Sequence, residues 1–463
     1  METRFHPGPL QPCIVAGTAA RSLVQSLRPG LGWIVILAGF AGLGGCAGDQ
    51  AARLAINDFD RADFGSAAVG FRAGAEARPF NENSLLNNAR LGMAALAAGD
   101  IDTSVGALGT AYKLLESGGV NDESRIFAAT VLHEGVLVYK GEPFEQAMTY
   151  TALAWGNALK GDWENVRVCA RASVRRLADF QQADPNAKDR MAREGVKLVE
   201  STFALGYLLE GVANHILNEP GDALDRAVSL NGSLRPVADA VKSGRFNTLV
   251  VVDWGRGPAK SPRGDDNAQT QWVPLDESAG EMRVTVPGEG TLAFSPAADV
   301  NRMSADYRWN NLGSARAFKS GLGTVLVVGG VTTAAASENK SAQIAGLAAA
   351  GAGLLMKLLA SADTRHNELL PARVFVAALE LPAQGADITI GFSGGRTAPI
   401  TIPAARPGTP SSPSVFYVRS LTAHGVRARP VTSWGYNASL QARSADDTAR
   451  QTWEPVPYRP GSD

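Results

Sequence analysis

Cysteine is scarce in this sequence, which has three in 463 residues. Cys13 is expected to lie in an N-terminal leader and Cys46 to carry a lipid, so Cys169 would be left as the one free cysteine. One leftover cysteine excludes an internal disulfide, and a lone cysteine is more often a buried apolar residue than a reactive one. Stability must therefore come from packing.

Motifs for metals, cofactors and catalysis are missing. The sequence has no HExxH, no CxxC and no calcium-binding loop, and Gly329-Gly330 lacks the Lys-Ser/Thr of a phosphate-binding loop. The histidines show no ligand spacing; they are His6, His133, His215, His366 and His424. We therefore expect no metal, no cofactor and no catalytic residue, and predict that the protein is not an enzyme.

No excess of charge of one sign is present, because 44 Lys and Arg balance 45 Asp and Glu to a formal net charge of −1. Phosphate binding needs a concentrated basic surface, so nucleic acid is not expected as a partner. A composition of 45% hydrophobic and 19% charged residues is typical of a globular chain long enough for two or three domains.

The N-terminus carries an apolar run, residues 31–43, that is followed by Gly44-Gly45-Cys46 and preceded by arginines. The run is too short to span a bilayer stably, since spanning needs roughly 20 apolar residues. Small residues directly before a cysteine are typical of a bacterial lipoprotein signal peptide, here residues 1–45, with lipidation at Cys46. An uncleaved anchor helix is the alternative.

Lipidation would tether the mature chain to a membrane of the cell envelope. Ala47 follows the cysteine, where an aspartate would favour retention in the inner membrane of enteric bacteria. The expected location is therefore the outer membrane, with the protein facing the periplasm and inner-membrane placement left open.

Residues 46–244 are predicted to be helical, with three copies of a pattern typical of tetratricopeptide (TPR) repeats. Small residues let two antiparallel helices approach, and a Gly-Asp pair ends the first helix and caps the second. Copies recur about every sixty residues rather than thirty-four, so we expect an irregular solenoid; an ordinary helical bundle is the alternative. The copies comprise Leu91-Gly92, Ala95, Gly99-Asp100, Ser104, Leu108 and Ala111; Leu153-Ala154, Gly161-Asp162, Val166 and Ala170; and Gly211, Asn218-Glu219, Ala223 and Ala227.

Residues 245–422 are predicted to form a β-rich domain, an antiparallel sandwich-like arrangement. The polar segment 259–271 is interpreted as a mobile linker, and the tail 423–463 as largely disordered. The fold class is thus an α+β multidomain protein, a TPR-like helical solenoid followed by this domain. The expected strands are 247–253, 282–286, 291–294, 373–379, 387–392, 399–402 and 414–418.

A Gly/Ala-rich helical insert, residues 319–361, interrupts the β-rich domain. It contains two apolar runs, 321–336 and 344–360, joined by a polar link. Small residues permit close helix approach, as in membrane helix pairs, although Lys357 interrupts the second run. The alternatives are a membrane-inserting hairpin and elements packed on the β-rich domain.

The order of these pieces resembles a family of uncharacterised bacterial lipoproteins with an N-terminal TPR-like region. The resemblance is carried by the segments 140–148 (KGEPFEQAM), 254–260 (WGRGPAK) and 362–365 (ADTR), the last followed by Leu370-Pro371. Asn367 stands where the family usually has an aromatic residue. The resemblance implies an architecture and a compartment, and it implies no reaction.

Two short motifs are candidates for interaction or structure. Glu142-Pro143-Phe144 is typical of a helix start, with Pro in the first turn and Glu near the positive end of the dipole. Phe144 either packs on the preceding helix or is an exposed docking point. Asp363 and Arg365 are interpreted as an ion pair or cap at a helix-to-strand corner, with a functional role as the alternative.

Gly391-Phe392-Ser393-Gly394-Gly395 matches the G-x-S-x-G nucleophile motif. That motif works where a strand enters and a helix leaves, and here a second strand is expected to follow. We interpret it as a β-turn.

These features predict a non-enzymatic envelope lipoprotein that binds a protein or peptide partner through its helical surface. A membrane-inserting or assembly protein that uses the Gly/Ala hairpin is the second hypothesis. An enzyme acting on cell-wall material is the third.

Overall fold

The computed structural model divides the chain into two compact units, Met1–Arg53 and Leu54–Asp463. Of the first unit the described part is residues 43–53, the beginning of helix α3 (Leu43–Asp60). The second unit is an α+β mix of helices and of antiparallel and mixed sheets. The described residues are 43–77, 81–116, 139–177, 179–180, 198–199, 201–263, 269–277, 279–306, 363–394, 399–421 and 430–436.

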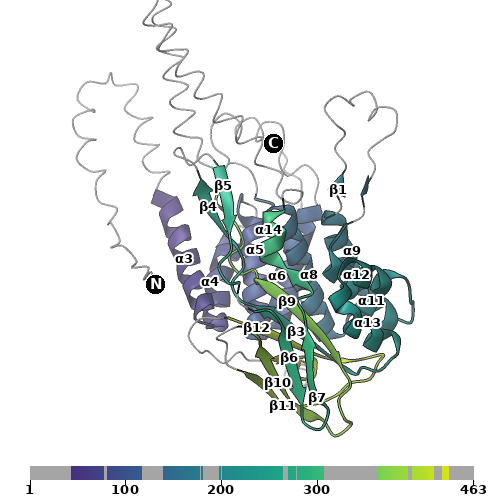
Figure 1. Ribbon diagram of the computed structural model, residues 1–463. Helices are drawn as coiled ribbons and strands as arrows, with labels where there is room; N and C mark the ends of the chain where they lie inside the picture. The colour runs from purple at the N-terminus through teal and green to yellow at the C-terminus, as the bar shows by residue number, and fades with distance from the viewer. Residues whose placement is uncertain are drawn as a thin grey trace, which may run out of the picture. The chain divides into compact units, whose positions relative to one another are not determined.

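Helices that follow one another in the chain also pack against one another. Contacts join α4 to α5, α5 to α6, α6 to α8, α8 to α9, α9 to α11 and α11 to α12, so these helices lie side by side in chain order (Figure 1). The bounds are α4 Phe64–Ala77, α5 Ser84–Ala98, α6 Ile101–Glu116, α8 Pro143–Lys160, α9 Trp163–Arg176, α11 Ala204–Ile216, α12 Ala223–Leu230, η4 Gly232–Leu234, α13 Arg235–Lys242 and α14 Val300–Ala305.

Three helix ends share one turn geometry. α5, α8 and the helical turn after α11 end at Gly99, Gly161 and Asn218, all with left-handed backbone (φ 85°, 75° and 57°). In each turn the next backbone N–H donates to the carbonyl five residues before it: Asp100 to Ala95, Asp162 to Asn157 and Glu219 to Asn214. This bond satisfies a carbonyl that the helix end would leave without an intrahelical donor.

Glycine brings the paired helices close together. A Cβ at Gly211 would lie 2.5 Å from Leu224 Cγ of the next helix, and a Cβ at Gly92 would clash with Leu108. Only a residue without a side chain fits at either place. The close approach therefore depends on these two glycines.

The strands form two larger sheets and two hairpin-like pairs. A five-stranded sheet has the order β13-β12-β3-β9-β8, and a four-stranded antiparallel sheet the order β11-β10-β6-β7. β4 pairs with β5, and β1 with β2. The bounds are β1 Asp179–Phe180, β2 Leu198–Val199, β3 Thr248–Trp254, β4 Ala259–Arg263, β5 Gln269–Val273, β6 Met282–Val286, β7 Gly290–Phe294, β8 Ala298–Asp299, β9 Arg373–Leu379, β10 Ala386–Phe392, β11 Ile400–Ala405, β12 Ser414–Ser420 and β13 Val431–Thr432.

The five-stranded sheet is mixed, because β12 runs parallel to β3 while its other pairs are antiparallel. The prediction of purely antiparallel pairing is therefore wrong for this sheet. Every residue of β3 and of β12 is buried. Strands covered on both faces carry continuous apolar runs, as parallel strands typically do, and such runs do not specify the direction of pairing.

Two predicted irregular segments contain strands. The segment 259–271, predicted to be a mobile linker, forms β4 and enters β5, and the two strands pair from Ala259 with Val273 to Arg263 with Gln269. Within the predicted tail, β13 pairs with β12, and Tyr436 donates its hydroxyl to Asp102 of α6 (2.7 Å). Neither segment contains a long apolar run, so neither was predicted to contain a strand.

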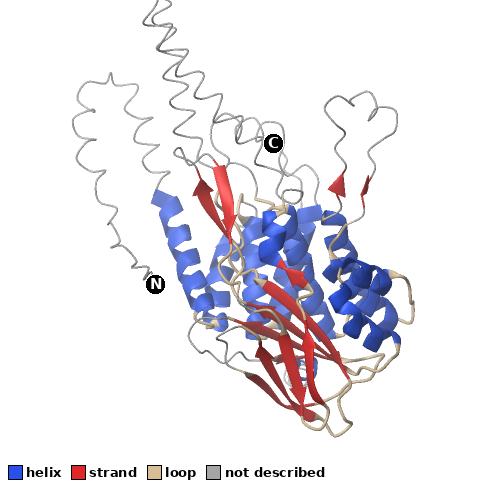
Figure 2. Cartoon of the chain, in the orientation of Figure 1, coloured by secondary structure: helices blue, strands red, loops and turns tan. Residues whose placement is uncertain are grey.

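Helices and strands share one hydrophobic core. α5 and α8 contact β12, and α13 contacts β9. The four-stranded sheet joins through Phe392, whose ring lies 5.6 Å from that of Phe375 and 6.1 Å from that of Trp254. The change from helix to strand lies between α13 and β3, close to the expected boundary at 244/245 (Figure 2).

Several predictions concern residues outside the described ranges. These are most of the leader, the Gly/Ala-rich insert 319–361, and the end of the tail from residue 437. Among the helices that the structure does describe, none is long and apolar enough to cross a bilayer.

Candidate functional site

Glu142, Pro143 and Phe144 begin helix α8. Pro143 occupies the first turn, where its missing N–H costs no helical hydrogen bond, and the backbone N–H of Glu142 donates to Oε2 of Glu145 (2.8 Å). Phe144 is fully buried, and its ring stands edge-on to Trp272 of β5 with centroids 4.9 Å apart. Because Phe144 is buried, it is not an exposed docking point. Its ring packs on Trp272 of the β4–β5 hairpin.

Glu142 forms a buried ion pair with a residue of the β4–β5 hairpin. Lys260 Nζ lies 3.3 Å from Glu142 Oε1, and the side chains are 4% and 2% exposed. The same ammonium lies 5.4 Å from the centre of the Trp272 ring. Charges in such a dry place are stable only when paired, so the hairpin is tied to the start of α8.

Asp363 and Arg365 form a bidentate ion pair. Arg365 Nε and Nη2 donate to the two carboxylate oxygens at 2.9 and 2.8 Å, and Nη1 donates to Asn83 Oδ1 at the start of α5 (3.0 Å). Burial alone would raise the pKa of Asp363, but hydrogen bonds and charge from Arg365 and the charge of Lys260 hold it below its ordinary value.

Glu145 joins these pairs. Its Oε1 accepts from the Tyr139 hydroxyl (2.6 Å) and from the backbone N–H of Asn367 (2.9 Å). Burial and the Glu145 charge raise the pKa of Tyr139 well above its ordinary value, so the phenol stays a donor. Asn367, which replaces the expected aromatic residue, is buried and directs Nδ2 toward Met93 of α5 (3.2 Å).

The predicted residues thus converge, but in a cluster whose carboxylates are each held by a cation or by hydrogen-bond donors. We name it the charged cluster: Tyr139, Glu142, Glu145, Lys260, Asp363, Arg365 and Asn367. Together with the bidentate pair Arg90–Glu368, it holds the segment before β9 against α5 and α8. Its geometry is that of a structural clamp, and sequence reasoning missed Glu145 and Lys260.

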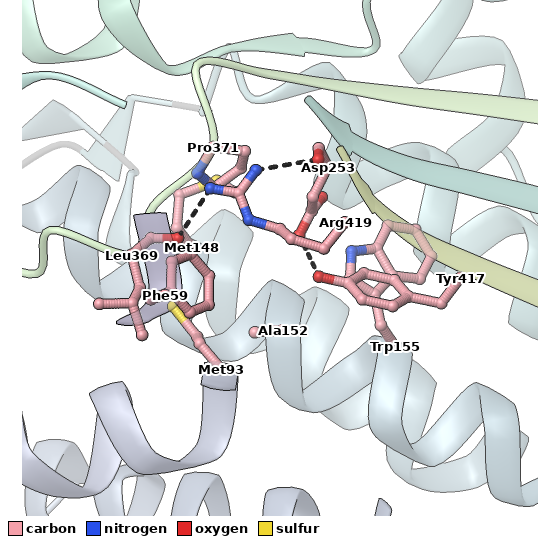
Figure 3. Close-up of a pocket in the computed structure, with 10 residues that line it drawn as sticks. All are labelled: Phe59, Met93, Met148, Ala152, Trp155, Asp253, Leu369, Pro371, Tyr417 and Arg419. Atoms are coloured by element: carbon pink, nitrogen blue, oxygen red, sulfur yellow. Dashed lines mark hydrogen bonds between the residues drawn. The ribbon is translucent and has the colours of Figure 1, made fainter. Parts of the chain in front are cut away.

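A closed cavity is lined by Phe59 and by residues of α5, α8 and strands β3 and β12 (Figure 3). Its volume is about 10 Å³, which is close to the minimum for one water molecule and too small for a substrate. Tyr417 donates its hydroxyl to Asp253 Oδ2 (2.9 Å), and Arg419 Nη1 donates to the backbone oxygen of Asp253 (2.9 Å). Sequence analysis did not identify these residues.

Asp253 supplies the carboxyl group of this cavity. Its Oδ1, together with Arg419 Nε and Trp155 Nε1, is buried without a hydrogen-bond partner among the described residues. Burial raises the pKa of Asp253 to about 6, against the lowering effects of the Arg419 charge and the Tyr417 hydrogen bond. The carboxyl therefore changes charge in a mildly acidic range.

An open groove of about 360 Å³ lies on the helices α9, α11 and α12. Arg171 of α9 pairs with Glu210 of α11 (2.7 Å), and Arg167 pairs with Glu219 of the following turn. Asn214 of α11 and Gly221 also line it. This volume falls within the range of small-ligand sites.

Ser393 of the G-x-S-x-G match lies at the end of β10. Its hydroxyl oxygen accepts from the backbone N–H of Glu281 (2.9 Å), and its own N–H donates to the Glu281 carbonyl (2.9 Å). The next described element is the antiparallel strand β11, in place of the helix that a nucleophile elbow requires. This is the strand–turn–strand arrangement that the sequence indicates.

Cys46 lies in α3, near its N-terminal end. No group of three or more His, Cys, Asp or Glu side chains suited to a metal ion occurs within the described ranges. Comparison of the chain with protein-family models, curated proteins and solved structures finds no match.

Proposed function

We propose that the protein is a lipid-anchored lipoprotein of the cell envelope that serves as a non-enzymatic scaffold. Its helical region, interpreted as a TPR-like solenoid, binds a protein or peptide partner. Cys46 carries the lipid, and the outer membrane, with the protein facing the periplasm, is the proposed location.

The observation that carries this proposal is the recurrence of one turn geometry at Gly99, Gly161 and Asn218. Three helix pairs joined by the same kind of turn, and helices that pack in chain order, are typical of a helical repeat protein. Stacked repeats expose an extended surface, and function on such a surface is usually binding.

The charged cluster and the closed cavity support a non-catalytic role. In the cluster each carboxylate has a cation or hydrogen-bond donors, and the cavity has room for about one water molecule. The open groove, by contrast, lies on the helices of the second and third copies of the pattern.

Partner binding is tested by site-specific photo-crosslinking in intact envelopes. Val168 of α9 and Leu292 of β7 are both exposed apolar residues, 46% and 50% exposed, and each receives the photo-reactive side chain in turn. We expect a discrete crosslinked partner from position 168 and none from position 292. Equal crosslinking from both, or none from either, would contradict the scaffold. Single-residue substitutions are used in place of a deletion of the helices. The helices and strands share one core, so such a deletion would unfold the sheet.

Anchoring is tested with a fatty-acid label and the variant Cys46→Ser. The thiol must form the thioether, and serine lacks the nucleophilicity of a thiolate, so only the wild type should be labelled. Equal labelling would defeat the lipoprotein assignment. Membrane retention of the unlabelled variant through an alkaline carbonate wash would instead favour insertion by residues 319–361.

A further inference from the structure

The turn between α3 and α4 has the same geometry as the three turns described above. Ala62 has a left-handed backbone (φ 58°), and the N–H of Asp63 donates to the carbonyl of Asp58, five residues before it (2.9 Å). Asp63 also caps α4, because its Oδ1 accepts from the N–H of Ser66 (3.1 Å), as the aspartates of the first two Gly-Asp turns do for α6 and α9. α3 and α4 therefore form a further helix pair of the same kind, on the N-terminal side of the other three.

The two helices of this pair are antiparallel and closely packed. The rings of Phe59 and Phe64 lie 5.0 Å apart beside the turn, and a Cβ at Gly70 would lie 2.8 Å from Ala55 Cβ. A glycine thus permits the close approach, as it does in two of the other pairs. Gly70 and Ala55 mark the line along which the two helices face each other.

The outer side of this pair ends the row of helices. Among the residues that the structure describes, no helix precedes α3, and α4 packs onward against α5 (Figure 1). In α4, Ala67, Ala68 and Phe71 are buried along one side of the helix. With about 100° of rotation per residue, Val69 projects from the opposite side.

Leu54 of α3 lies on the same outer side as Val69. Each of the two stands one residue before the point at which the helices face each other. Because the helices are antiparallel and both right-handed, the two side chains project to the same side. They are 59% and 71% exposed, the most exposed large apolar side chains among the described residues. Exposed small residues stand one turn before and one turn after Val69. We name this surface the terminal face: Leu54, Gly65, Val69 and Ala73.

The chemistry of the terminal face favours a second face of the same kind. The outer side of the last helices in a repeat array is normally polar, because nothing packs on it. The terminal face carries no charge, so two such faces can meet without bringing like charges together, and it has nothing to attract anionic lipid headgroups. Gly65 permits the close approach of another helix.

The proposed anchor brings such faces together. Cys46 stands eight residues before Leu54, so even a fully extended chain keeps the terminal face within about 28 Å of the lipid. Copies anchored in one membrane therefore present their terminal faces at similar heights and at a raised effective concentration.

We propose that two copies of this chain associate through their terminal faces, about a two-fold axis parallel to α3 and α4, with Leu54 of each copy packed on Val69 of the other. An axis in this direction keeps the N-terminal ends of both helix pairs on one side, as two chains held in one membrane require. The face is small compared with the roughly 800 Å² per partner of a stable interface, so association depends on the shared membrane. This inference rests on the proposed lipid anchor, and it gives the scaffold two helical surfaces with which to bind partners.

The pairing is tested by mild oxidation of intact envelopes that contain two differently tagged full-length chains, one with Leu54→Cys and the other with Val69→Cys. Cys169 is buried and Cys46 carries the proposed lipid, so the introduced thiols are the ones available. We expect a disulfide-linked product that carries both tags and little product from either chain alone, because a disulfide requires Cβ atoms about 4 Å apart. Leu292→Cys, at an apolar residue of β7 that is 50% exposed, is the matched control and should give no dimer.

A lipid cover is distinguished from a second copy by dilution. In phosphatidylcholine vesicles with many chains each, a water-soluble maleimide should modify Leu54→Cys slowly. This protection should be lost at less than one chain per vesicle, and also when Val69→Glu is added. Protection that persists on dilution would assign the terminal face to the lipid surface and overturn the proposal.

Absence of the mixed disulfide, or equal amounts of mixed and single-tag products, would overturn the proposal as well. If the mixed disulfide were absent while fatty acid labelled Cys46 and position 168 crosslinked its partner, the dimer would fail and the scaffold would stand.

Discussion

Asp253→Asn should change how the stability of this protein depends on pH. The Asp253 carboxyl is enclosed among α8, β3 and β12, where it accepts one hydrogen bond from Tyr417. The Arg419 guanidinium is directed at backbone oxygens, including that of Asp253. Burial consequently raises the pKa of Asp253 from 3.8 to about 6. Asparagine keeps the shape and an acceptor for Tyr417 but cannot ionise.

The sign follows from the two pKa values. Between 3.8 and about 6 the unfolded chain has lost this proton and the folded chain still holds it. The stability that Asp253 contributes is therefore complete below 3.8 and is lost as the pH rises through about 6. At about 1.4 kcal/mol per pH unit, the loss is about 3 kcal/mol.

Urea unfolding from pH 4 to pH 8 measures this loss. The free energy of unfolding of Asp253→Asn minus that of the wild type should rise by about 2–3 kcal/mol between pH 4 and pH 7 and then stay level. Asp239→Asn, at an exposed position of α13, is the matched control for the chemical change itself. A flat or falling difference for Asp253→Asn would refute the reasoning.

Three further predictions concern packing, buried charge and the thiol. Gly92→Ala places a Cβ against the next helix and should lower the free energy of unfolding by about 1–3 kcal/mol. Gly106→Ala, with nothing described within 4 Å, should instead raise it by about 0.5–1 kcal/mol. Equal effects of the two substitutions in denaturation curves would contradict this. Lys260→Met should lower the free energy of unfolding by about 3–5 kcal/mol in the same assay, because it leaves the Glu142 carboxylate buried without its cation. Adding Glu142→Gln should recover most of that loss, and no recovery would contradict the pairing. Burial raises the pKa of the Cys169 thiol to about 12, so a colorimetric thiol reagent at pH 8 should label the lipidated chain only after unfolding. Prompt labelling of the folded chain would be inconsistent with that burial.

The helix ends were predictable from sequence because they depend on local chemistry. A left-handed residue followed by a capping carboxylate needs only a few neighbouring positions, and Gly99 and Gly161 are both followed by aspartate. Asn218 has the same left-handed backbone conformation, which is less favourable for a residue with a Cβ than for glycine. Pro143 is likewise informative by itself, because proline is suited to the first helical turn.

The partners of the site residues could not be predicted in the same way. Asp363 and Arg365 are two residues apart, and their ion pair was expected. Lys260 reaches Glu142 from a hairpin that looked like a linker, because its pairing requires no long apolar run. Asp253 was counted simply as the end of an apolar strand. Long-range pairing of charges leaves no periodic trace in a single sequence.

The order of the strands also affects when the fold can form. β3 is the middle strand of its sheet, and its neighbours β9 and β12 both come from the C-terminal third of the chain. During synthesis from the N-terminus, β3 is made long before either neighbour. The faces of α5 and α8 that contact β12 likewise stay uncovered until β12 has been made. Distant pairing of this kind slows folding. If the chain is exported unfolded to the proposed periplasmic location, this order would keep it unfolded until its last strands have been made.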